Sequence, residues 1–171
     1  MTKTTLHIEF TRPTKWFSPI SWLIRAVQCT PYSHVRLRWT NTTDRDLVYH
    51  ASGSSVDFVG TIAQSYEKNQ VTVIKSYSLP VDKKQYRKLI DVCMLYANVK
   101  YSKLQVVKIG LLSLGLGKGW FTKDGEYAQV CSELVARVIE QVYDKDLGLD
   151  PDVAGPKEID KALETIIKED K

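Results

Sequence analysis

Apolar and polar residues alternate in several short stretches of this chain. In the first stretch, Leu6, Ile8 and Phe10 are separated by His7 and Glu9, which is the period-two pattern of a strand with one buried face. The later stretches show the same alternation or are short runs rich in valine and tyrosine. We expect strands over residues 6–10, 34–39, 47–50, 56–59 and 71–77.

Other stretches repeat their apolar residues every three to four positions, as amphipathic helices do. The clearest begins at Asp82, where Gln85 three residues later completes a capping box. We expect helices from Pro19 to about Gln28, from Asp82 to about Ala97, over Leu104–Leu114, after Cys131 and after Pro156. No linker or repeat divides the chain. Residues 1–171 therefore predict one α+β domain with an antiparallel sheet packed against helices.

Composition adds limits on the surroundings and partners. The chain is 43% hydrophobic and 26% charged, with a net charge of +4 and no block of like charges, so we expect no nucleic-acid partner. Three cysteines without close pairing indicate a reducing compartment. We expect a cytoplasmic protein, because no signal peptide opens the chain and the apolar stretch 16–27 is too short to cross a bilayer. Aromatic residues in that stretch leave a peripheral membrane contact open, and the sequence does not fix an oligomeric state.

Cys131 is the first candidate for chemistry. It stands at the expected start of a helix, where unpaired N–H groups and the helix dipole favour a thiolate and can bind an oxyanion. Cys29 falls at a helix end and Cys93 on an apolar helix face, so we expect Cys131 to be the most reactive of the three. The alternative is that Cys131 is a buried cysteine that acts as a small hydrophobic residue.

His34 is the second candidate, because a cysteine nucleophile needs a base and the base needs an orienting partner. His34 begins an expected strand and His50 ends the next one, so antiparallel pairing brings them together. The equally open alternative is that His50 is a surface residue. His7, on the polar face of the first strand, is expected to be structural or exposed.

The motifs Ser33-His34-Val35 and Cys131-Ser132-Glu133-Leu134-Val135, in that order, resemble the circularly permuted branch of the NlpC-type papain-like superfamily. That branch includes YiiX-like proteins and the lecithin:retinol acyltransferase group. The resemblance covers roughly residues 6–142. It implies a permuted papain-like fold, with a sheet or half-barrel against helices, and assigns Cys131 as nucleophile, His34 as base and His50 as the third polar residue.

The reaction expected from this resemblance is hydrolysis or transfer at an amide, peptide or ester carbonyl, without a cofactor or metal. The acyl substrate is a small molecule, a peptide or a lipid. Tyr32, Arg36 and Arg38 are candidate substrate contacts. The arginines share the face of His34 by strand parity and could bind an anionic group, whereas a bulge would turn them to solvent.

Two other classes of function stay open. The first is a binding or structural protein on the same fold with an inactive site. The second is a metal-binding protein that uses Cys131, His34 and His50, which are ligand types that zinc accepts.

Overall fold

The fold is built on a mixed arrangement of strands and helices, seen here in a computed structural model of the chain. It describes residues 4–14, 19–40, 45–52, 55–60, 71–97, 99–101, 128–129, 131–150 and 154–169. The strands are β1 (Thr4–Pro13), β2 (His34–Thr40), β3 (Asp46–Ser52), β4 (Ser55–Gly60), β5 (Val71–Val81), β6 (Lys100–Tyr101) and β7 (Ala128–Gln129). The helices are α1 (Pro19–Gln28), α3 (Lys83–Leu95), α5 (Cys131–Tyr143) and α6 (Pro156–Glu169). The α+β class expected from the sequence is confirmed.

The described strands form one sheet in the order β5-β1-β2-β3-β4-β6-β7. All neighbours are antiparallel except the two-residue strands β6 and β7, which pair in parallel. Strand β5 continues beyond the expected residue 77 to Val81, because Pro80 lies on an edge strand, where a missing N–H costs no ladder bond. The helix expected over Leu104–Leu114 lies outside the described residues.

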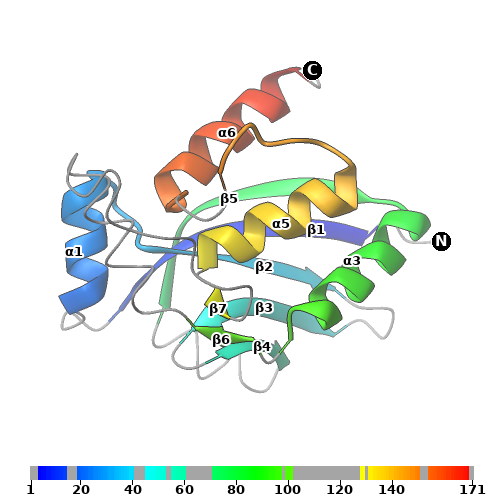
Figure 1. The fold of residues 1–171 in the computed structure, drawn as a ribbon, viewed down its shortest axis with the longest axis horizontal. Coiled ribbons are helices and arrows are strands. Elements are labelled where there is room, and N and C mark those ends of the chain that lie inside the picture. Colours follow the sequence, from blue (N-terminus) through cyan, green and yellow to red (C-terminus); the bar gives the residue numbers. More distant parts are fainter. Residues whose placement is uncertain are drawn as a thin grey trace.

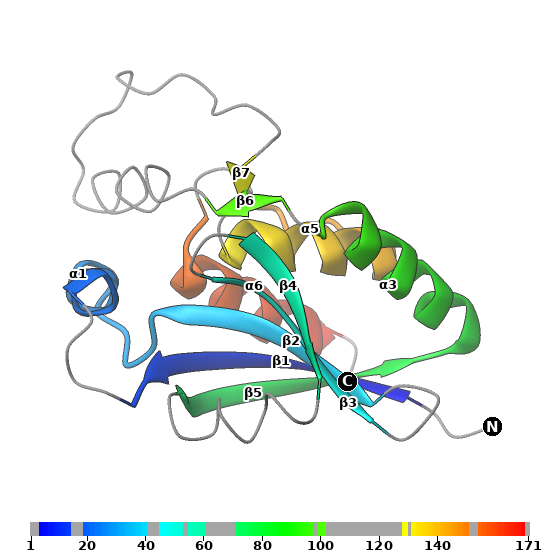
Figure 2. The same ribbon diagram turned by 90° about the horizontal axis from the view of Figure 1, so that it is seen from below.

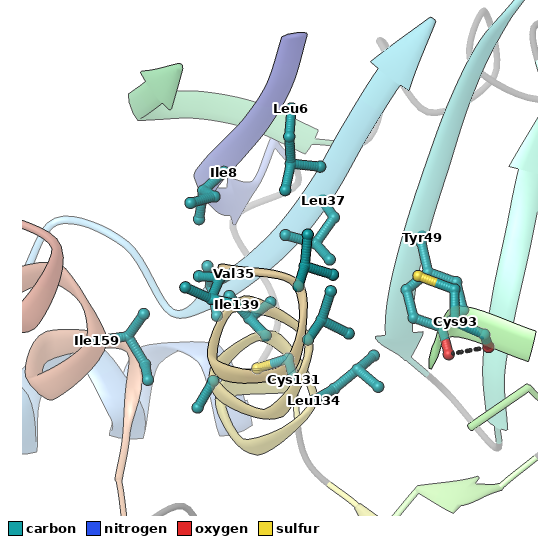
Figure 3. Close-up of a cluster of buried hydrophobic side chains, with 14 of the residues drawn as sticks. Leu6, Ile8, Val35, Leu37, Tyr49, Cys93, Cys131, Leu134, Ile139 and Ile159 are labelled. Atoms are coloured by element: carbon teal, nitrogen blue, oxygen red, sulfur yellow. Dashed lines mark hydrogen bonds between the residues drawn. The ribbon is translucent and has the colours of Figure 1, made fainter. Parts of the chain in front are cut away.

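Helices α3, α5 and α6 lie on one side of the sheet (Figures 1 and 2). Side chains of β1 and β2 that point to this side are fully buried, and they pack in one cluster with α5 (Figure 3). The cluster joins Ile8, Val35 and Leu37 from the strands to Leu134 and Ile139 from α5. Burial of each such side chain contributes about 1.5–3 kcal/mol, so the axis of α5 is held along β2.

Helix α3 begins with the capping box that the sequence predicts. Asp82 accepts a hydrogen bond from the backbone N–H of Gln85, and the Gln85 side chain accepts one from the Asp82 N–H. Its Cys93 is fully buried, and the Cys93 carbonyl accepts a 2.7 Å hydrogen bond from the Tyr49 hydroxyl of β3. No helix in the described part of the chain combines the length and apolar character needed to cross a bilayer.

The opposite side of β1 and β2 carries a buried ion cluster. Glu9 of β1 is only 3% exposed, and its carboxylate accepts hydrogen bonds from Nε of Arg36 at 2.9 Å and Nε of Arg38 at 2.6 Å. The register pairs Glu9 directly with Arg36. One carboxylate therefore holds two guanidinium groups of β2 in place, on the same face as His34.

Replacing Glu9 by Ala should destabilise the fold strongly, because it leaves the nearly buried Arg36 without the carboxylate that it shares with Arg38. Loss of one partner of a buried ion pair costs about 3–5 kcal/mol, which urea unfolding would measure. Lys88→Ala is the matched control, since the Lys88–Asp144 pair lies at the surface and solvent screens it. Equal losses in the two variants would contradict this account of Glu9.

Candidate active site

Cys131 is the first residue of α5, at the start of the helix as the sequence predicts, and it is 5% exposed. Its sulfur accepts a hydrogen bond from the backbone N–H of Val35, the residue that follows His34 in β2. The pairing of β2 with β3 runs from Thr40 back only to the Leu37–Tyr49 pair, so it stops two residues short of Val35. The packing of α5 along β2 thus brings the thiol to the first residues of the strand.

The electrostatic surroundings of Cys131 differ from the expectation. Burial raises the pKa of the Cys131 thiol, and it outweighs the backbone N–H groups of Val35, Ser132 and Cys131 itself, which lower that pKa. The prediction of a thiolate favoured by the helix start is therefore wrong for this conformation. Desolvation penalises the charged form more than the helix start stabilises it, and the thiol is neutral at neutral pH.

His34 begins β2 and lies opposite Thr11 of β1 in the register. Its Nε2 atom is buried and has no hydrogen-bond partner among the described residues. Burial, together with the positive charge of the neighbouring His50 and Arg36, lowers the pKa of His34 to about 3. The imidazole is therefore neutral at physiological pH, with a buried nitrogen able to accept a proton or donate a hydrogen bond.

His50 reaches His34 from the neighbouring strand, as the sequence predicts. The two imidazole rings meet edge to face, with centroids 5.8 Å apart and planes at 75°. The register of β2 and β3 explains the contact. When the pairing of Leu37 with Tyr49 is continued by one residue, His50 lies opposite Arg36. His50 is then diagonal to His34 and on the same face of the sheet. The structure thus brings the two histidines together, within a strand pair that sequence reasoning expected.

The Cys131 sulfur lies at Val35, and His34 is the preceding residue of β2, but the two side chains do not bind each other. In the part of the chain that the structure describes, no hydrogen bond links the thiol to the imidazole. The Val35 side chain lies in the cluster under α5, so strand parity turns His34 toward the other face. A reacting pair requires a distance of about 2.6–3.2 Å, which unliganded sites often lack.

The three candidate substrate contacts are all engaged with other side chains. The Tyr32 hydroxyl donates a 2.6 Å hydrogen bond to Asp160 of α6. Arg36 and Arg38 share the face of His34, as predicted, but both bind Glu9. The alternative of a bulge in β2 is wrong, since the β1–β2 register runs without a shift from His34 to Trp39.

Three residues that contact β2 or the segment before it escaped the sequence reasoning: Glu9, Thr11 and Asp160. Thr11 is fully buried, and its hydroxyl, like Nε2 of His34, has no hydrogen-bond partner among the described residues. Alternation identified β1 as a strand, and hence Glu9 and Thr11 as residues of one face. No sequence signal pointed to their partners, because these depend on the register between β1 and β2 and on where α6 packs.

Comparison of the chain with protein-family models and with curated protein sequences finds no match. Among the described residues, no group of three or more His, Cys, Asp or Glu side chains is arranged to hold a metal ion. The assignment of function therefore depends on the geometry around Cys131, His34 and His50.

The low pKa of His34 should make the fold sensitive to acid. Its pKa of about 3 in the folded chain lies below the ordinary 6.5, so the unfolded chain binds a proton that the folded chain does not. The contribution of His34 to the free energy of unfolding is then fully present above pH 6.5. It is lost as the pH drops toward 3, by an amount on the order of a few kcal/mol. Urea unfolding at a series of pH values should show a smaller loss for His34→Leu than for the wild type.

His7→Gln provides the control for that experiment, because burial lowers the pKa of His7 less than that of His34 and His7 hydrogen-bonds Ser78 through Nδ1 at 3.0 Å. This variant should keep most of the acid loss of the wild type. If His34→Leu loses as much stability between pH 6.5 and 3 as the wild type does, the imidazole is not buried in the folded chain.

Proposed function

We propose that this protein is a thiol-dependent hydrolase or acyltransferase, with Cys131 as nucleophile, His34 as base and His50 as the residue that orients His34. The observation that carries the proposal is the meeting of three features at the start of β2. The Cys131 sulfur lies on the N–H of Val35, the buried Nε2 of His34 has no partner among the described residues, and His50 packs edge to face on His34.

The proposed reaction begins with a neutral pair. As Sγ of Cys131 attacks the carbonyl carbon, its proton passes to Nε2 of His34, and the carbonyl oxygen takes up the negative charge. Backbone N–H groups in the first turn of α5 stabilise that oxyanion. Collapse of the intermediate breaks the bond to the leaving group, which takes the proton from His34. Water or a second substrate then releases the acyl group from the thioester, with His34 accepting its proton.

The order of the chain supports a permuted papain-like fold for this chemistry. Histidine precedes cysteine, the histidine begins a strand in an antiparallel sheet, and the cysteine begins a helix packed on that sheet. The substrates that fit this proposal are small-molecule, peptide or lipid acyl compounds. The proposed chemistry requires neither a metal nor a cofactor.

A protein of the same fold with an inactive site is the second candidate function. The observation that favours it is the resting state of the pair: burial raises the pKa of Cys131 and lowers that of His34, and no hydrogen bond joins them within the described residues. An active enzyme must close this pair on binding its substrate, whereas a binding protein leaves it as it is.

Labelling of Cys131 with an acyl-directed electrophile separates these two functions. The experiment uses Cys29→Ser, because Cys29 is exposed and would consume the reagent. Cys131 should react about tenfold or more faster than Cys93, since a positioned base accelerates attack by the thiol. Cys93 is the control within the same molecule, because burial raises its pKa as well. Peptide mapping by mass spectrometry measures both rates.

His34→Ala should reduce the Cys131 rate nearly to that of Cys93, since the proton acceptor is gone. Equal rates for Cys131 and Cys93, or a Cys131 rate that does not respond to His34→Ala, would support the inactive site and contradict the enzyme.

The orienting role of His50 predicts a particular kinetic change. His50→Ala should lower kinact for the electrophile by about tenfold and leave KI nearly unchanged, because the loss falls on the alignment of the base and not on reagent binding. His7→Ala is the matched control, since His7 lies on β1 and bonds Ser78. An unchanged kinact in His50→Ala would make His50 a bystander.

A further inference from the structure

The segment Ala154–Asp160, which leads into α6, touches both halves of the candidate site. On the side of the nucleophile, the Ser132 hydroxyl donates a buried 2.6 Å hydrogen bond to the Ala154 carbonyl. Ser132 directly follows Cys131. Helix α6 accordingly begins beside the start of α5 (Figures 1 and 2).

On the side of the base, Asp160 binds Tyr32, which lies two residues before His34. The carboxylate accepts hydrogen bonds from the Tyr32 hydroxyl and the Tyr77 hydroxyl, each at 2.6 Å, and from Nζ of Lys75 at 2.7 Å. Burial raises the pKa of Asp160, but these bonds outweigh it and hold the pKa below the ordinary value. Burial and the bond to Asp160 raise the pKa of Tyr32, so Tyr32 remains a donor to an ionised carboxylate.

The few residues that lead from α1 to His34 are held from several sides. The Thr30 hydroxyl donates to the Tyr32 carbonyl at 2.8 Å, and the Ser33 N–H donates to the Thr11 carbonyl at 3.0 Å. The hydroxyls of Ser21 and Ser33 form a buried hydrogen bond. Among these bonds, only the one from Tyr32 to Asp160 has its partner in α6, 128 residues later in the sequence.

A third contact ties the segment to the end of α1. Gln28 is 3% exposed, and its side chain accepts from the Lys157 N–H at 3.3 Å and donates to Glu158 at 3.2 Å. A Cβ at Gly155 would lie 1.8 Å from Nε2 of Gln28. A larger residue at position 155 would therefore displace the Gln28 amide from its bonds to Lys157 and Glu158.

We propose that Ala154–Asp160 is a clamp that sets the position of His34 relative to Cys131, with Asp160 as the positioning residue that acts through Tyr32. This inference rests on the proposed function for its catalytic meaning. The clamp joins the helix that carries the nucleophile to the segment that carries the base, which belong to different elements. Because no hydrogen bond joins Cys131 to His34, contacts of the surrounding segments set their relative position. The clamp adds such contacts to the packing of α5 on β2.

The test compares two variants that each remove one hydroxyl from the same carboxylate. Tyr32→Phe removes the 2.6 Å bond on the His34 side, and Tyr77→Phe removes the 2.6 Å bond from β5. Both leave Lys75 on Asp160. The measurement is the NMR titration of the His34 ring, assigned with His34→Ala, together with the Cys131 alkylation rate as a function of pH in the Cys29→Ser background.

Tyr32→Phe should raise the pKa of His34 toward its ordinary value, because the freed segment lets water reach the ring, and should lower the Cys131 rate about fivefold, the change that corresponds to one net hydrogen bond. Tyr77→Phe should lower the thermal midpoint to a similar extent and leave both readouts unchanged. Equal effects of the two variants on the His34 titration, or no effect of Tyr32→Phe, would overturn the clamp.

The two proposals can fail separately in this experiment. If the Cys131 rate of the wild type is insensitive to His34→Ala, the proposed function fails, and the His34 titration alone then decides whether the clamp positions the ring. If the rate depends on His34 but Tyr32→Phe and Tyr77→Phe behave alike, the function stands and the clamp is wrong.

Discussion

Helix α5 lies along β2 because both present apolar faces that water would otherwise cover, and this contact decides where Cys131 can be. Val35 and Leu37 of the strand share one buried cluster with Leu134 and Ile139 of the helix. Since the helix axis follows the strand, the first residue of α5 meets the first residues of β2, where the Val35 N–H binds the sulfur. Without this packing, Cys131 and His34 would lie in unrelated parts of the fold.

The same burial that places the site also controls its chemistry. It favours the neutral thiol of Cys131 and the neutral imidazole of His34, in opposition to the helix start, which favours a thiolate. Here desolvation is the larger effect. In the proposed enzyme, charge therefore develops only during the reaction, and alignment of the two groups matters more than their resting ionisation.

Two carboxylates, one on each side of the sheet, hold β2 and the segment that leads into it. Glu9 holds Arg36 and Arg38, and the charge of Arg36 contributes to the low pKa of His34. Asp160 reaches Tyr32 from α6. These carboxylates come from opposite ends of the chain, and each fixes residues of β2 or of the segment before it.

The sequence alone determined what depends on near neighbours. Alternation identified the strands that carry Glu9, His34 and His50, the capping box at Asp82 identified the start of a helix, and the position of Cys131 at a helix start followed from the pattern after it. These features are local because backbone geometry and side-chain direction repeat over a few residues.

Only the tertiary structure decided which of these residues meet and in what charge state. The Glu9–Arg36 pair and the Tyr32–Asp160 bond depend on strand register and on the packing of α6, and the sequence contains no short-range signal for either. The neutral state of Cys131 depends on how completely α5 and β2 exclude water from it. Burial is a property of the whole assembled core, so the pattern that placed Cys131 at a helix start could not reveal the sign of its pKa shift.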